Sequence, residues 1–201
     1  MIFLRRENVR QYIRLYPVTS LILLAVIVLF LWMEISGSST DNWTLLKYGA
    51  MYKIEGLVAP EWWRYVTAIF VHIGWEHLLF NAFAIYVFAA PLERLMGHIP
   101  YAIFFLLCGA GGNLLSQWLS EPPMMSAGAS GAIYGVYAAF LYLALFYKHV
   151  LDNDSSQVIK VIVIIGFINS LLPHINLLGH LGGFLTGLLV CAILSLRYRS
   201  R

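Results

Sequence analysis

Long apolar segments alternate with short polar stretches along most of this chain. Crossing a bilayer as a helix takes about 20 mostly apolar residues. Six segments approach or exceed that length, at residues 17–35, 72–95, 99–119, 128–148, 157–173 and 177–197. The fifth is the least regular, because Lys160, Asn169 and Ser170 interrupt its apolar run. The pattern predicts an all-α polytopic membrane protein built from a bundle of six transmembrane helices.

Composition supports a membrane protein over a soluble one. Hydrophobic residues make up 60% of the 201 residues, only 11% are charged, and the mean hydropathy is +0.76. A soluble domain of this length would need more charged residues at its surface than this chain has. We therefore predict the lipid bilayer as a partner that covers the apolar surface. Cys108 and Cys191 lie in apolar runs and behave as small hydrophobic residues. No basic patch with interleaved aromatics is present, and no nucleic-acid partner is expected.

The first apolar segment follows four arginines and so shares one feature with a signal peptide. Its run ends at Glu34-Ile35-Ser36-Gly37, without a clear small-x-small cleavage pattern, and further spans follow. The sequence therefore favours a retained first helix.

The distribution of lysine and arginine predicts the orientation in the membrane. Six spans and a cytoplasmic N-terminus place three of the 13 basic residues outside and ten inside, a positive-inside bias. We expect a multi-pass protein of the cell membrane with both termini cytoplasmic. The predicted organisation is a cytoplasmic tail over 1–16, one membrane domain over 17–197 and a cytoplasmic tail over 198–201. An outer loop over about 36–70, rich in Trp and Tyr, is expected partly in the headgroup layer.

A serine and a histidine lie at the starts of two spans that run in the same direction. Ser130 stands in Gly128-Ala129-Ser130-Gly131, and His180 stands in Gly179-His180-Leu181-Gly182-Gly183. Polar groups at membrane depth are costly and are functional candidates by default. A serine hydroxyl needs a base to become nucleophilic, and the flanking glycines allow helices to approach closely. A packing seam without chemistry is the alternative. The pair favours a catalytic role, with Ser130 as nucleophile and His180 as general base.

Three further residues are candidates for the same site. His77 and Asn81 are four apart, so they share one face of the second span and both can donate hydrogen bonds. That suits an oxyanion site together with the Ser130 N–H, although an Asn in a membrane helix also commonly links helices. Tyr134 follows Ser130 by one turn, and its ring could pack on His180. No acidic residue in the spans lies near the outer side to orient His180, so a dyad is expected.

A metal site is the competing chemistry. His72, Glu76, His77 and His180 could be imagined as ligands. However, His72 to His77 reads H-x-x-x-E-H, one residue longer than the inverted zinc-protease pattern, and H-E-x-x-H is absent. The sequence therefore predicts no metal and no cofactor.

These motifs together resemble the rhomboid family of intramembrane serine proteases. The matching features are Trp63-Arg64, His77-x-x-x-Asn81, Gly128-Ala129-Ser130-Gly131-x-x-x-Gly135, Tyr134 and Gly179-His180-Leu181-Gly182-Gly183. Glu93-x-x-x-Gly97 resembles a further family element, with Ala89 where a glycine is usual. The likeness covers residues 17 to 197.

The resemblance implies a rhomboid-like bundle of six helices whose active site opens outward. It implies that Ser130 attacks, that His180 is the base and that Tyr134 stacks on His180. His77, Asn81 and the Ser130 N–H would form the oxyanion site, with Gly128 and Gly131 supporting the serine. Substrates would be transmembrane proteins cleaved near the outer end of a helix that unwinds locally. They would enter by movement of the fifth helix and of residues 173–176.

Two other functions remain as alternatives. A non-catalytic rhomboid-like protein would bind membrane helices without cleaving them, but it would be expected to lack Ser130 or His180. A transporter would call for broken helices in paired halves, and the sequence shows no such symmetry.

Overall fold

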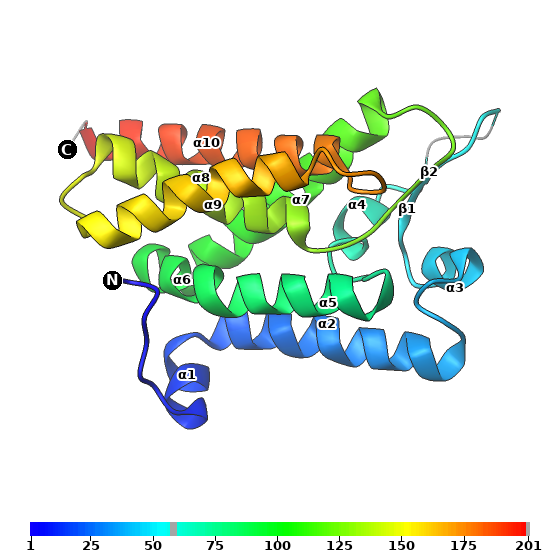
Figure 1. Cartoon of the computed structure of the whole chain (residues 1–201), viewed down its shortest axis with the longest axis horizontal. Coiled ribbons are helices and arrows are strands. Elements are labelled where there is room, and N and C mark those ends of the chain that lie inside the picture. Colours follow the sequence, from blue (N-terminus) through cyan, green and yellow to red (C-terminus); the bar gives the residue numbers. More distant parts are fainter. Residues whose placement is uncertain (57–59, 200–201) are drawn as a thin grey trace.

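The computed structural model describes residues 1–56 and 60–199 and forms a helical bundle with one short pair of strands (Figure 1). Residues 57–59 of the predicted loop and 200–201 of the predicted C-terminal tail lie outside the described residues. The elements are α1 (Val9–Leu15), α2 (Pro17–Ser36), α3 (Asn42–Lys47), β1 (Met51–Lys53), α4 (Arg64–Thr67), α5 (Gly74–Ala84), η1 (Ile85–Ala89), α6 (Ala90–Met96), α7 (His98–Leu119), β2 (Met124–Ser126), α8 (Ser130–Phe146), α9 (Asn153–Asn169) and α10 (Leu177–Arg199).

The long apolar helices agree with the predicted membrane class. In the described part of the chain, four helices are long and apolar enough to span a bilayer: Pro17–Ser36, Gly74–Met96, His98–Leu119 and Leu177–Leu196. The second of these runs through α5, the π-helical turn η1 and α6. Helices α8 and α9 are shorter, at 17 residues each, or about 25 Å. That the chain crosses the membrane six times therefore stays a prediction.

Helix α9 begins and ends about four residues earlier than its apolar run indicated. Asp152 caps its N-terminus, because the Asp152 carboxylate accepts hydrogen bonds from the Ser155 backbone N–H at 2.9 Å and the Ser155 hydroxyl at 2.7 Å. These two bonds stabilise the charged form and lower the pKa of Asp152 to about 2. The helix ends at Asn169, so Ser170 lies at its C-cap.

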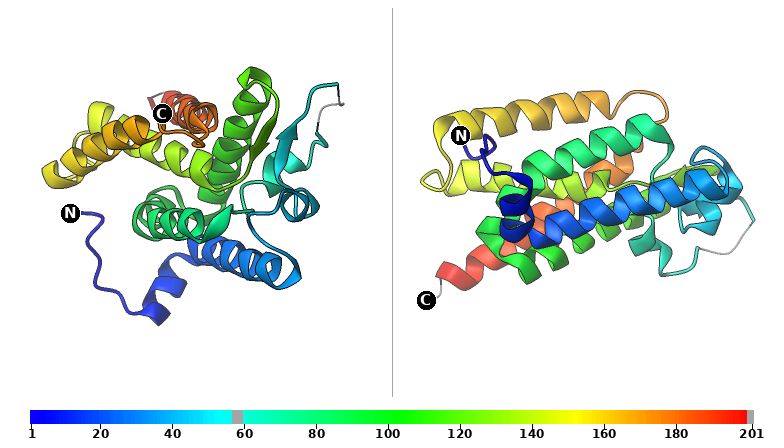
Figure 2. Two further views of the ribbon diagram at one scale, coloured as in Figure 1. Left: turned by 45° about the vertical axis from the view of Figure 1, so that its right-hand side comes forward. Right: turned by 90° about the horizontal axis from the view of Figure 1, so that it is seen from below.

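Helices α7, α8 and α10 form the centre of the bundle, and glycines lie where their backbones meet (Figure 2). A Cβ at Gly183 of α10 would overlap the carbonyl oxygen of Gly131 in α8. A Cβ at Gly187, one turn on, would lie 2.7 Å from the Gly135 carbonyl oxygen. The predicted small-xxx-small faces of α8 and α10 therefore pack against each other.

Helix α9 packs chiefly on α8, at the edge of the bundle (Figures 1 and 2). Its other face carries exposed apolar side chains, as expected of a surface against lipid: Val161, Ile164, Ile165 and Ile168. Among the described residues, α8 is therefore the main protein neighbour of α9, with smaller contacts to α10 and the N-terminal segment.

The predicted outer loop contains α3, β1 and α4 and is tied to the segment that leads into α8. Strand β1 pairs antiparallel with β2, with Met51 opposite Ser126. Arg64 is buried and donates to the carbonyls of Leu46 at 2.8 Å and Ala50 at 2.9 Å. Its Nε also donates to Glu61 at 2.6 Å, and this bond lowers the pKa of the Glu61 carboxyl. The loop thus holds the segment of chain that leads to Ser130 in place.

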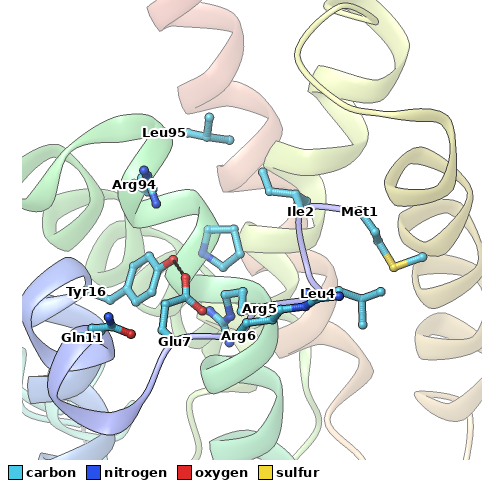
Figure 3. Close-up of a pocket in the computed structure, with 11 residues that line it drawn as sticks. Met1, Ile2, Leu4, Arg5, Arg6, Glu7, Gln11, Tyr16, Arg94 and Leu95 are labelled. Carbon is cyan, nitrogen blue, oxygen red and sulfur yellow. Dashed lines mark hydrogen bonds between the residues drawn. The ribbon is translucent and has the colours of Figure 1, made fainter.

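The segment predicted as an N-terminal tail packs on the bundle. The Phe3 ring is buried edge-on against Phe88 and Phe140. Figure 3 shows the cavity of about 690 Å³ that this segment forms with α6, where the Tyr16 hydroxyl donates to Glu7 at 3.0 Å. The residues that line this cavity include none of the candidate catalytic residues.

Glu93 of α6 caps the N-terminus of α2. Its buried carboxylate accepts from the backbone N–H groups of Val18 at 3.0 Å and Thr19 at 2.8 Å, and from the Thr19 hydroxyl at 2.6 Å. His98 Nδ1 lies 2.6 Å from the same carboxylate. Glu93 therefore joins two helices far apart in the sequence.

We expect Glu93→Ala to destabilise the fold by about 1–3 kcal/mol, because it leaves buried N–H donors of α2 without an acceptor. Thermal unfolding in detergent measures the effect. Glu93→Gln, which keeps one acceptor oxygen, should fall between the wild type and Glu93→Ala. Glu121→Ala, at an exposed loop residue, should unfold at the wild-type temperature. Equal midpoints for Glu93→Ala and Glu121→Ala would contradict the capping role.

Candidate active site

The predicted site residues come from the starts of three helices. Ser130 is the first residue of α8, and His180 lies in the first turn of α10. His77 lies in the first turn of α5, and Asn81 follows one turn later. The three helix starts lie at the same end of the bundle (Figure 1). They are joined by direct contacts between α8 and each of the other two helices.

The starts of α8 and α10 touch through their backbones. A Cβ at Gly131 would lie 3.2 Å from the carbonyl oxygen of Gly179, the residue before His180. Gly131 is in turn the residue after Ser130, so the serine and the histidine flank this contact. Ser130 is half-buried and His180 is buried. A side chain larger than hydrogen at the contact would push the two residues apart.

The ring of Tyr134 stacks on the imidazole of His180. The ring centroids are 4.1 Å apart and the planes differ by 10°. Since Tyr134 lies one turn after Ser130, the stack holds the imidazole over the first turns of α8. The structure thus contains the packing that the Ser130–Tyr134 spacing indicated. The catalytic role of that packing stays a prediction.

The imidazole of His180 also meets a residue that the sequence analysis did not place in the site. The Ser170 hydroxyl, at the C-cap of α9, lies 2.7 Å from His180 Nδ1 and 2.8 Å from the Tyr134 hydroxyl. It donates to the Gly166 carbonyl at 2.8 Å. The one available signal was a polar interruption of the fifth apolar run at Ser170.

His77 lies against the loop that leads into α8. A Cβ at Gly128 would lie 2.5 Å from His77 Cε1 and 2.6 Å from Nε2, so the imidazole occupies the space beside this glycine. Gly128 also has φ +124°, which L side chains rarely adopt. The Ile73 N–H lies 3.5 Å from His77 Nδ1. This contact favours a proton on Nε2, the nitrogen nearer Gly128.

Asn81 is buried one turn below His77. Its Nδ2 donates to the His77 carbonyl at 2.8 Å, which leaves a second N–H on the same nitrogen. Its Oδ1 is buried and has no hydrogen-bond partner among residues 1–56 and 60–199. Ser130 adds a third donor, because the first N–H groups of a helix have no acceptor within that helix. These donors come from α5 and from the start of α8, and the His77 ring lies beside Gly128, two residues before Ser130.

His72, considered as a metal ligand, has a structural position instead. It is fully buried, and its Nε2 accepts a hydrogen bond of 3.3 Å from the N–H of Ala129, the residue before Ser130. Its Nδ1 lies 3.1 Å from the carbonyl of Phe70. Within the described ranges no three His, Cys, Asp or Glu side chains are grouped so that they could hold a metal ion. His72 thus supports the entry into α8.

Known proteins are similar to this chain over most of its length. The family model described as "Rhomboid domain" matches residues 59–197. The chain belongs to the rhomboid family. One relative, named "Putative rhomboid protease YdcA" in Bacillus subtilis, is 36% identical over 193 residues, which cover 94% of each chain. Membership places this rhomboid among intramembrane serine proteases with a multi-pass membrane fold.

Two further relatives carry the same class of name. The protein named "Rhomboid protease GluP" in Bacillus subtilis is 38% identical over 181 residues, which cover 89% of this chain and 35% of that one. The "Rhomboid-type serine protease 2" of Emericella nidulans is 32% identical over 135 residues, 65% of this chain and 26% of that one. This rhomboid therefore spans nearly the whole YdcA relative but about a third of the GluP relative.

Proposed function

We propose that this rhomboid is an intramembrane endopeptidase that works by a Ser130–His180 dyad. The stack of Tyr134 on His180 carries the proposal, because it holds the imidazole beside the helix turn that begins with Ser130. The Ser130 hydroxyl would attack the scissile carbonyl while His180 Nε2 takes its proton. His180 would then protonate the leaving amine, and water would release the acyl group.

The oxyanion of the tetrahedral intermediate would lie near the start of α8. We assign its stabilisation to the Ser130 N–H, His77 and Asn81. Support comes from the position of His77 beside Gly128 and from the N–H that Asn81 has to spare. Donors fixed in place before the reaction stabilise the developing charge without reorganising.

A serine-directed probe tests the dyad. A fluorophosphonate should form an adduct on Ser130 as the hydroxyl displaces fluoride, and peptide mass spectrometry identifies the modified residue. His180→Ala should remove this labelling, while His149→Ala, at an exposed loop residue, should leave it unchanged. An adduct on another serine, or labelling that survives His180→Ala, would contradict the assignment.

We infer that the substrates are transmembrane proteins cleaved in or next to their membrane segment. The carbonyl groups of an intact helix are hydrogen-bonded and shielded, so hydrolysis requires a locally unwound segment. The basic-residue bias supports cytoplasmic termini for this rhomboid and a Ser130 end at the outer face. Good substrates should therefore carry helix-destabilising residues near the outer boundary.

Making that boundary more helical should slow cleavage. Replacing one glycine of a single-span substrate by alanine favours the helix by about 1 kcal/mol, so about fivefold slower cleavage is expected. Initial rates in liposomes measure the effect. The same exchange at the far end of the segment is the control and should leave the rate unchanged. Equal rates for both exchanges would argue against unwinding.

The alternative is a rhomboid-like protein that binds membrane helices without cleaving them. It would bind a single-span substrate and show neither cleavage nor labelling of Ser130. This result across several substrates would favour the alternative.

A further inference from the structure

We propose that Ser170, the C-cap of α9, is a positioning residue that holds His180 as the tautomer able to act as a base. The proposal rests on the Ser130–His180 function above and adds a third side chain, from a helix outside the predicted dyad. The Ser170 hydroxyl oxygen accepts the Nδ1–H of His180. Nε2 is then left without a proton and free to take one from Ser130.

The assignment of the proton follows from the three contacts of one hydroxyl. A serine hydroxyl has one hydrogen to donate and two lone pairs to accept with. The Gly166 carbonyl, 2.8 Å away, can only accept, so it takes the hydrogen of Ser170. Both remaining contacts must then donate to Ser170, from the Tyr134 hydroxyl at 2.8 Å and from His180 Nδ1 at 2.7 Å. Neutral His180 therefore carries its proton on Nδ1.

The surroundings of Ser170 keep this arrangement in place. Ser170 is 2% exposed, so water does not compete for its hydroxyl. Tyr134 stacks on the imidazole of His180. Its hydroxyl also donates to the Ser170 hydroxyl that the imidazole contacts. A Cβ at Gly166 would lie 2.9 Å from the Tyr134 hydroxyl oxygen, so the glycine makes room for that group. Gly166 in the last turn of α9 and Ser170 at its C-cap thus both contact the stacked pair of Tyr134 and His180.

This contact supplies one part of what a carboxylate supplies in a triad, without its negative charge. A buried acceptor on Nδ1 selects the tautomer and the orientation of the imidazole. When Nε2 takes the proton of Ser130, the Nδ1–H of the imidazolium still donates to the Ser170 oxygen. Without that acceptor, the Nε2–H tautomer becomes accessible, and it has no lone pair to offer Ser130. The rate should then fall while substrate binding stays the same.

Steady-state cleavage of a single-span substrate by the full chain in liposomes tests the role. We expect Ser170→Ala to lower kcat about 10–100-fold with KM unchanged, because the buried hydroxyl orients the base. Ser155→Ala is the matched control. It removes another buried, hydrogen-bonded serine from the same helix at the opposite end, and it should keep the wild-type kcat.

A second pair of variants separates the hydrogen bond from packing. Ser170→Thr keeps the hydroxyl, and Ser170→Val has nearly the same shape without it. We expect Thr to restore most of kcat and Val to behave like Ala, with both measured well below their unfolding temperatures, because Val leaves the donors of Tyr134 and His180 without an acceptor and should unfold earlier. This comparison still decides the question if Ser170→Ala unfolds.

The outcomes distinguish this inference from the proposed function. Cleavage that survives Ser130→Ala or His180→Ala overturns the dyad itself. Cleavage lost in both, with wild-type kcat in Ser170→Ala or Ser170→Val, overturns only the role of Ser170. An equal loss of kcat in Ser155→Ala would assign the effect to the stability of α9 and would also overturn that role.

Discussion

Replacing either Ser130 or His180 by alanine should lower substrate cleavage by about 10³-fold or more. Ser130→Ala removes the attacking oxygen, and His180→Ala removes the base that makes the oxygen nucleophilic. The double variant should be no slower than either single variant, because residues that act as one unit are not additive. Cleavage of a tagged single-span protein, co-reconstituted in liposomes at matched enzyme amounts, measures all three.

Two controls separate lost chemistry from lost structure. Ser195→Ala removes a serine of α10 that is hydrogen-bonded to Tyr142, far along the helix from His180. His149→Ala removes an exposed loop histidine. Both should cleave at the wild-type rate and unfold at the same temperature as Ser130→Ala. Residual cleavage in Ser130→Ala close to that of the controls would rule out Ser130 as the nucleophile.

The sequence predicted that Ser130 and His180 lie at the same end of the bundle, because the direction of each span follows from the basic-residue bias. Ser130 and His180 are 50 positions apart, yet both begin spans predicted to run in the same direction. The separation of four residues between Ser130 and Tyr134 then predicted the stack of Tyr134 on His180. Membership of the rhomboid family and the class of membrane protease agree with these expectations.

Contacts that depend on tertiary packing could not be predicted from the sequence. The position of Ser170 depends on where α9 ends and how it is rotated against α8, and an interrupted apolar run determines neither. His72 was considered only as a ligand, because nothing in the chain indicates that Ala129 would donate to it. The N-terminal segment was predicted as a tail, since the burial of Phe3 depends on two distant aromatic residues.

The contact between α8 and α10 should be the point at which the smallest substitution does the most damage. A Cβ at Gly183 would overlap the Gly131 carbonyl oxygen and lie 2.9 Å from the Gly131 Cα. Backbone atoms, unlike the end of a flexible side chain, move only with their helix. We expect Gly183→Ala to destabilise the fold by about 3 kcal/mol, the upper end of the usual cost of overpacking. Separating the helices would also move His180 from Ser130, so cleavage should be lost.

Gly131→Ala provides the graded comparison within the same contact. Its Cβ would lie 3.2 Å from the Gly179 carbonyl oxygen, a distance that a shift of a few tenths of an ångström relieves. Its midpoint of thermal unfolding in detergent should fall between those of the wild type and Gly183→Ala. If Gly183→Ala unfolded no earlier than Gly131→Ala, the backbone contact would not be what holds α8 and α10 together. The position of the His180 imidazole would then depend mainly on the Tyr134 stack and Ser170.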